Sequence, residues 1–232
     1  MGKTSEKLTW KSDNAIWYPQ PITRLQSHLS VLIVSGTPFP SEKVLPLRKN
    51  LAYNLQYIEF LDRLIKDIHL STVLWTLNVK SFAVHSAAVV EGILNYVVVS
   101  KGCATTTEWQ SCKKLPSNQY EVGENILFHE TEVFIKIAHP ILCEMTFDQM
   151  AKKVESKKLL GEVDGLYAAI SRIRKLRNKI HLYSGEGSND TDYNNFNASE
   201  YKLARNVLHG VLTCPLFETS ARKNCFDYLK NT

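Results

Sequence analysis

Four side chains that could bind and act on an anion lie within eight residues of one another, beside apolar residues at helical spacing: Arg174, Arg177, Asn178 and His181. An imidazole, whose unperturbed pKa is about 6.5, can accept and return a proton near neutral pH. A guanidinium stays charged and offers a planar fork of donors that suits phosphate or carboxylate oxygens. Together these residue types favour acid–base chemistry on an anionic substrate.

Helical geometry predicts that the four side chains share one face. At about 100° per residue, Arg174 lies about 20° from His181 if one helix carries both. Arg177 lies about 40° from His181, and Asn178 lies about 60° away on the other side. The face overlaps the edge of the apolar stripe of the same helix. We therefore expect these polar groups at the margin of the core, in a groove or an interface.

The segment LRNKIHLY resembles the R-x(4–6)-H motif of HEPN domains, an all-helical family of ribonucleases and of toxin or defence modules of prokaryotes. The shared features are an asparagine after the arginine, as at Arg177 and Asn178, and a tyrosine two residues after the histidine. In this chain these last two residues are His181 and Tyr183. Three residues separate Arg177 from His181, whereas six separate Arg174 from it. Either Arg174 is the motif arginine and Arg177 assists, or Arg177 has the role after a one-residue contraction.

The resemblance implies a metal-independent endoribonuclease without a cofactor, acting on RNA as a symmetric homodimer whose two motif helices line a shared cleft. His181 would remove the proton of a ribose 2′-OH. Arg177 or Arg174 would bind the scissile phosphate, and cleavage would leave a 2′,3′-cyclic phosphate. Asn178 would orient the phosphate or the histidine, and Tyr183 would donate a hydrogen bond or stack on a base.

A polar or acidic residue often lies opposite the motif helix in HEPN domains, and Glu91 in the apolar segment AAVVEGILNY is the candidate here. Its alternative interpretation is a structural carboxylate held by a basic neighbour, Arg174 and Arg177 among them. The two roles are compatible.

Two classes of function follow from these residues. The first is a HEPN ribonuclease that acts as a toxin or phage-defence effector and is restrained by an antitoxin or another regulatory protein. The second is a non-catalytic helical module whose same face binds nucleic acid, a nucleotide or a protein partner. The three-residue spacing between Arg177 and His181 favours the second class.

Apolar residues at intervals of three and four predict a mainly α fold, a HEPN-like bundle of about five helices in a single domain over 47–232. Thr146 and Gln149 form a capping box, and Gly161 is expected to end that helix. The stripe of the motif helix consists of Leu166, Ile170, Ile173, Leu176 and Ile180. Helices are expected at about 47–68, 77–102, 146–161 and 164–183, and from Asn197 to before Pro215.

Two segments are expected outside the bundle. Residues 1–46 contain five of the eight prolines and are predicted to be an extended N-terminal arm, with LSVLIVSG as a strand. Residues at about 103–145 mix turn residues with β-branched runs and predict an irregular or small β insertion with one or two strands.

Composition favours a cytoplasmic protein. The net charge is +5, from 28 basic and 23 acidic residues, which gives weak support to a polyanionic partner. The five cysteines lack a C-x-x-C pair, so neither a disulfide framework nor a zinc site is expected. The N-terminus lacks the apolar stretch of a secretory signal. The apolar run 82–99 is interrupted by His85, Glu91 and Asn95, which favours a core helix over a membrane span.

Overall fold

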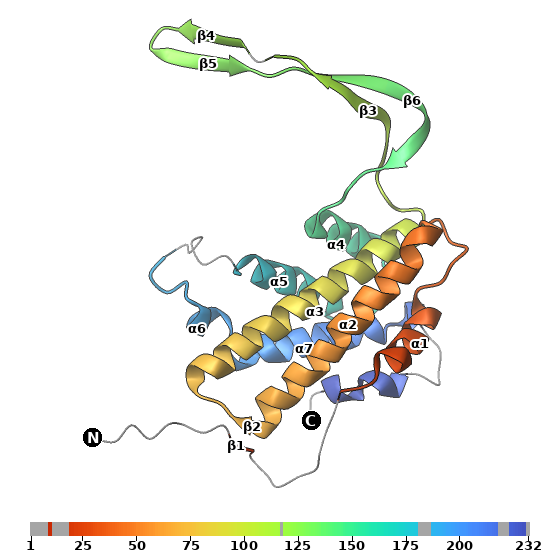
Figure 1. Cartoon of the computed structure of the whole chain (residues 1–232), viewed down its shortest axis with the longest axis vertical. Helices are drawn as coiled ribbons and strands as arrows, with labels where there is room; N and C mark the ends of the chain where they lie inside the picture. Colours follow the sequence, from red (N-terminus) through yellow and green to blue (C-terminus); the bar gives the residue numbers. More distant parts are fainter. Residues whose placement is uncertain (1–8, 11–18, 117, 181–186, 218–222, 231–232) are drawn as a thin grey trace. The chain divides into compact units, whose positions relative to one another are not determined.

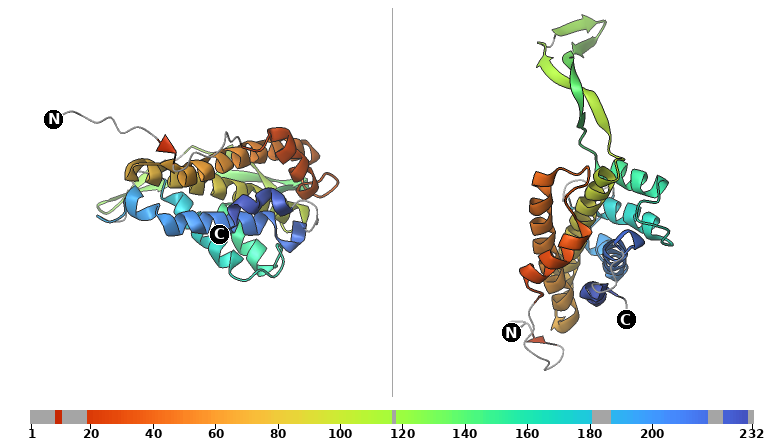
Figure 2. Two further views of the ribbon diagram at one scale, coloured as in Figure 1. Left: turned by 90° about the horizontal axis from the view of Figure 1, so that it is seen from below. Right: turned by 90° about the vertical axis from the view of Figure 1, so that its right-hand side faces the viewer.

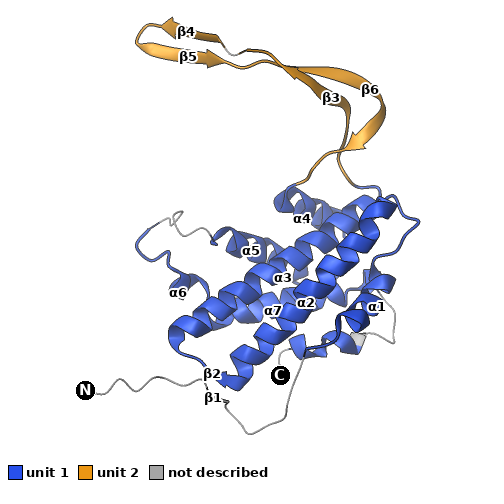
Figure 3. Ribbon diagram, viewed as in Figure 1, with its two compact units in different colours: residues 1–103, 146–232 blue, residues 104–145 orange. Residues whose placement is uncertain are grey.

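The computed structural model describes residues 9–10, 19–116, 118–180, 187–217 and 223–230. The chain forms two compact units, a helical unit of residues 1–103 and 146–232 and an insertion unit, Ala104–Met145 (Figure 3). The protein is mainly helical with an antiparallel β insertion, as the sequence predicts. The insertion begins and ends within a residue of the expected bounds.

Two long antiparallel helices form the centre of the helical unit, α2 (Ser41–Asp67) and α3 (Thr72–Ser100). The short strand β2 (Ile68–His69) follows α2 and pairs with β1 (Thr9–Trp10). Helix α3 lies between α2 and α7 (Ala198–Leu212), as Figures 1 and 2 show. Its sequence is apolar almost all round, so helices must cover it on several sides.

Helix α3 is the one described helix whose length and composition would suffice to cross a membrane. However, 67% of its most apolar 18-residue window is buried inside the helical unit. This burial is typical of the central helix of a protein core, as the interrupted apolar run predicts.

The remaining helices surround this pair. Helix α1 packs on α2, whereas α4 and α5 pack on α3 and on each other, and α5 also contacts α7. Their bounds are Ile22–Leu32 for α1, Phe147–Ser156 for α4, Leu166–Asn178 for α5 and Asp192–Asn195 for α6, with 3₁₀ turns at Pro215–Phe217 (η1) and Lys223–Leu229 (η2).

Several local predictions are confirmed. The capping box is formed at the start of α4, where Gln149 and Thr146 satisfy each other's backbone N–H groups. The four apolar residues predicted to face the core from within α5 are buried: Leu166, Ile170, Ile173 and Leu176. The expected end of α4 is wrong, because the helix ends at Ser156 and Gly161 lies in the following turn at φ +87°.

The prediction of an extended N-terminal arm is wrong over 22–32 and 41–46, which are helical. Most of LSVLIVSG lies in or directly after α1, and α2 begins at Ser41. Pro21 and Pro40 directly precede the two helices, where a missing N–H has no helical partner to lose. Leu25 and Leu29 are buried at helical spacing. Proline therefore marks the helix starts here rather than an absence of helix.

The insertion unit contains four strands, more than the one or two expected. Strand β3 (Thr106–Lys114) pairs antiparallel with β6 (Glu132–Leu142), and β4 (Asn118–Val122) pairs antiparallel with β5 (Asn125–His129). None of its described residues is buried. A two-stranded ribbon has no second layer to cover its apolar side chains.

A buried charge network joins α2 to α7. Asp62 is only 1% exposed and forms ion pairs with Arg205 (Oδ1 to Nε, 3.2 Å) and Lys66 (Oδ2 to Nζ, 2.7 Å). The Tyr201 hydroxyl donates to Asp62 Oδ1 at 2.5 Å. Arg205 also donates to the backbone carbonyl of Tyr228 in η2. A buried carboxylate with this many partners fixes the alignment of the helices that carry them.

Tyr201→Phe is expected to lower the free energy of unfolding by about 1.5–3 kcal/mol, because it removes a hydrogen bond to a buried charge. Burial, and then the charge of Asp62, raise the pKa of Tyr201 above its ordinary value, so the phenol donates in its neutral form. The contribution is present below about pH 10 and is lost as the pH rises further. Urea denaturation of both proteins measures the difference.

The control for this prediction is Tyr193→Phe, which removes the hydroxyl of a tyrosine that is 66% exposed. It should change stability by less than about 0.5 kcal/mol. Equal losses in the two variants would contradict a structural role for the Tyr201–Asp62 bond.

Candidate functional site

Helix α5 carries the candidate arginines and is held tightly against the core. Its first residue, Leu166, approaches Gly210 of α7 so closely that a Cβ at Gly210 would lie 2.8 Å from Leu166 Cδ1. The missing side chain lets the two helices pack closely. The apolar stripe of α5 fixes its rotation, so Arg174 and Arg177 emerge half-buried at the margin of the core.

Arg177 and Glu91 are brought together from α5 and α3. Arg177 Nη2 lies 3.2 Å from Glu91 Oε2, and the two side chains are 39% and 26% exposed. One of the contacts expected for Glu91 is thereby formed. An arginine in this position is oriented by a carboxylate, while part of its fork remains accessible to solvent.

Arg174 has a different partner. Its Nη2 lies 3.1 Å from Oδ1 of Asp148, in the first turn of α4. The hydrogen bond from Lys152, and then the charge of Arg174, lower the pKa of Asp148. The buried Nε of Arg174 has no acceptor among the described residues. The sequence does not predict a role for Asp148, because nothing in its local pattern indicates a partner on a helix 26 residues further along the chain.

Helix α5 is shorter than predicted. It ends at Asn178, and the N–H groups of Lys179 and Ile180 donate to carbonyls three residues back, which closes the helix with a 3₁₀ turn. Asn178 is exposed. His181 and Tyr183 lie outside the described residues. The helical projection that grouped the four polar residues therefore holds only as far as Asn178.

The described residues at both ends of the connection from α5 to α6 form ion pairs or hydrogen bonds with neighbouring residues. Lys179 Nζ lies 2.6 Å from Asp190 Oδ2, and Asn195 of α6 donates to the other oxygen of Asp190 at 2.5 Å. Lys80 of α3 pairs with Asp192 of α6 at 2.9 Å. Lys80 and Glu91 are eleven residues apart, about 16 Å along α3. Arg177, just before this connection, and Asp192, just after it, therefore pair with residues of α3 that are about three turns apart.

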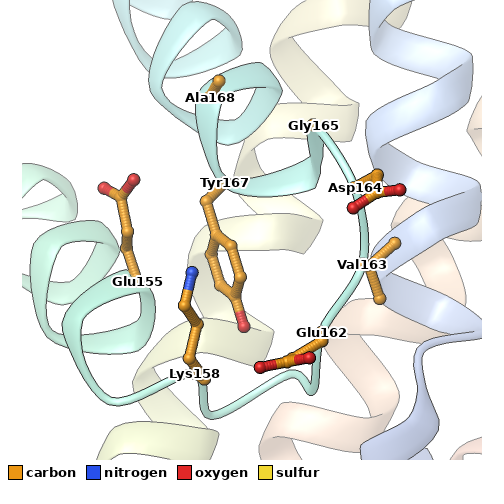
Figure 4. Close-up of a pocket in the computed structure, with 8 residues that line it drawn as sticks. All are labelled: Glu155, Lys158, Glu162, Val163, Asp164, Gly165, Tyr167 and Ala168. Atoms are coloured by element: carbon orange, nitrogen blue, oxygen red, sulfur yellow. The ribbon is translucent and has the colours of Figure 1, made fainter.

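A separate cavity of about 320 Å³ lies beside the start of α5 (Figure 4). The Lys158 ammonium lies 5.0 Å from the centre of the Tyr167 ring, and the Tyr167 hydroxyl donates to the Gly161 carbonyl at 2.7 Å. Three carboxylates also line the cavity: Glu155, Glu162 and Asp164. With three negative charges and one positive charge, this cavity is unsuited to a phosphate.

The two arginines could bind an anion, and the sequence that follows them contains a histidine. Over the described ranges, no group of three or more histidine, cysteine, aspartate or glutamate side chains could hold a metal ion. Asn178 is exposed beside Arg177 on the last turn of α5. Arg174, Arg177, Glu91 and Asp148 define what we term the α5 charge cluster.

Comparisons with protein-family models, with curated proteins and with solved structures gave no match. The α5 charge cluster is therefore interpreted from its own geometry and chemistry.

The Arg177–Glu91 pair is expected to be weak. A double-mutant cycle with Arg177→Ala and Glu91→Ala should give a coupling energy of about 0.2–1 kcal/mol, because both side chains are partly solvated. Urea denaturation of the four proteins measures it. A coupling above about 2 kcal/mol would identify a structural ion pair. In that case a phosphate could not readily replace Glu91 as the partner of Arg177.

Proposed function

We propose that the protein is a metal-independent endoribonuclease of the HEPN type, acting in the cytoplasm as a toxin or phage-defence effector. The observation that carries this proposal is the Arg177–Glu91 pair. It holds a guanidinium at the margin of the core, four residues before His181. The resemblance of LRNKIHLY to the HEPN motif supports the same assignment.

Charge supports an anionic ligand at this site. Arg174, Arg177 and Lys179 lie within six residues of one another. The two arginines pair with carboxylates of α4 and α3, and Lys179 pairs with Asp190 of the connection to α6. Partly exposed ion pairs are typically worth about 0–1 kcal/mol, so a phosphate can replace a carboxylate at little cost. A guanidinium also binds phosphate oxygens in a bidentate manner.

We assign the phosphate-binding role to Arg177. His181 is one peptide bond beyond Ile180, and Arg177 is the nearer of the two arginines along the chain. Arg174 is drawn instead towards α4 by Asp148. Arg174 would then assist by adding positive charge near the scissile phosphate.

The proposed reaction is an internal transesterification. The His181 imidazole takes the proton of the 2′-OH, and the 2′-oxygen forms a bond to phosphorus. The bond from phosphorus to the 5′-oxygen breaks, and the leaving oxygen takes up a proton from solvent. Arg177 neutralises the charge that develops on the phosphoryl oxygens. The products are a 2′,3′-cyclic phosphate and a 5′-hydroxyl. Asn178 and Tyr183 would orient the substrate.

The resemblance further supports a homodimer in which two copies of the motif segment line one RNA-binding cleft. An antitoxin or another regulatory protein would restrain such an activity in the cell.

A second candidate function is a non-catalytic module that binds nucleic acid, a nucleotide or a protein through the same cluster. The observation that favours it is that both arginines already have carboxylate partners, a stable arrangement that needs no substrate. RNA binding without cleavage by the purified protein would support this function.

His181→Ala is expected to abolish RNA cleavage, with a loss of at least about 10²-fold, because it removes the general base. The assay follows structured and unstructured RNA in the presence of EDTA and identifies the 2′,3′-cyclic phosphate ends. His139→Ala, at an exposed histidine of the insertion unit, is the matched control and should leave cleavage unchanged. Cleavage retained by a folded His181→Ala protein would refute the proposal.

The two arginines should differ in importance. Arg177→Ala is expected to lower kcat by about 10²–10³-fold, as removal of one group that stabilises the transition state does. Arg174→Ala should cost less than about tenfold. Arg172→Ala is the control, because Arg172 is 62% exposed and pairs with Glu200 of α7. Single-turnover cleavage rates measure all three, and a larger loss for Arg174→Ala would reverse the assignment.

A further inference from the structure

Strand β5 of the insertion unit has an edge that differs from those of the other strands. Natural sheet edges are usually blocked by charged side chains, proline or bulges. Strand β5 has none of these, since its sequence is NILFH and its register with β4 is regular. The other strands carry such features: Glu121 in β4, Glu108, Lys113 and two register shifts in β3, and Glu132, Lys136 and Pro140 in β6.

Three apolar side chains of β5 are exposed. Ile126 is 70% exposed, Phe128 is 59% exposed and Leu127 is 41% exposed. A short, uncharged, β-prone segment without proline readily pairs with another strand. An apolar surface of this kind marks an interaction site on a protein that stays soluble.

The register of the β4–β5 hairpin determines which backbone groups are available. In a hairpin with a two-residue turn the flanking pair, here Val122 and Asn125, exchanges hydrogen bonds, and successive pairs then alternate. The N–H and C=O groups of Ile126 and Phe128 therefore point away from β4. These groups form a row to which a further strand can add.

From this edge we infer that β5 pairs with β5 of a second copy of this chain, which joins two hairpins into a four-stranded antiparallel sheet. A two-fold axis at Leu127 places Leu127 opposite its own copy. It also places Ile126 opposite Phe128 of the other copy, and the reverse. Each such pair exchanges two backbone hydrogen bonds, and aromatic side chains opposite β-branched ones are favourable cross-strand neighbours.

Charge argues against a nucleic acid as the occupant, and the self-complementary register of β5 favours a second copy of the chain. Residues 104–145 contain six acidic and three basic residues, a net charge of −3 in a chain whose net charge is +5. This unit therefore repels a phosphate backbone. However, β5 itself contains no charged residue, so no like charges lie opposite each other across the axis, and the apolar residues of the two copies match there.

The interface is small, because a five-residue strand is only about 17 Å long. Interfaces of this size give weak or transient complexes. We therefore expect a dimer that dissociates on dilution. The homodimer proposed for the ribonuclease would form through the α5 motif segments, so it is a separate contact, and substitutions at Leu127 test the β5 contact alone.

The test is sedimentation equilibrium of the full chain up to about 100 μM, with Leu127→Glu and Leu127→Lys. Each variant places two like charges opposite each other on the axis and should weaken the dimer at least tenfold. An equimolar mixture of the two variants should form a heterodimer within a few-fold of the wild-type affinity. Tyr120→Glu is the matched control, because Tyr120 is the β4 residue that pairs with Leu127. This variant should dimerise like the wild type.

Three outcomes would overturn the inference. The first is a wild-type chain that remains monomeric throughout this range, which would leave the edge to a strand of another protein. The second is self-association of the same stoichiometry and affinity in the wild type and in both Leu127 variants, which would assign all self-association to other surfaces. The third is a mixture of the two variants that stays monomeric although circular dichroism shows that each variant is folded.

Discussion

The arrangement of the helical unit depends on the burial of α3. This helix is apolar on almost all sides, and covering it requires α2 on one flank, α7 on another, and α4 and α5 on the remainder. Because Glu91 interrupts the apolar surface of α3, the helix that packs there must supply a cation or leave the carboxylate unpaired at the edge of the core. Arg177 of α5 supplies it. The burial of one helix thus determines where the charges of another lie.

Charged groups have two different roles in this unit. Asp62 and Arg205 are almost fully buried and share several further hydrogen bonds, so losing one partner would leave a buried charge uncompensated, typically at about 3–5 kcal/mol. Arg174 and Arg177 are paired at the solvent boundary, where comparable pairs contribute about 0–1 kcal/mol. The first set maintains the alignment of the helices. We propose that the second set exchanges its partners for a ligand.

The insertion unit follows the opposite principle. The helical unit buries its apolar residues in its own core, whereas strands β3 to β6 leave theirs exposed on a two-stranded ribbon. Charges, bulges and a proline protect most of its edges, and β5 lacks all three. A ribbon of this kind gains stability from association, since only a further strand or layer can cover it. The two units therefore have opposite net charges. We propose that the first binds an anion and the second another strand.

The sequence by itself determined the approximate positions of α2, α3, α4, α5 and α7. The burial of Leu166, Ile170 and Leu176 follows from their spacing, and the cap at Thr146 follows from hydrogen bonds within one turn; both are local properties of the chain. The helix over 22–32 was missed because proline was interpreted as a helix breaker, although it can also directly precede a helix. Of the candidate site, the sequence identified Glu91 and both arginines. Only the tertiary structure decided that Arg177 pairs with Glu91 and Arg174 with Asp148, because ion pairs between elements depend on how the helices cross, which residue spacing along one helix does not specify.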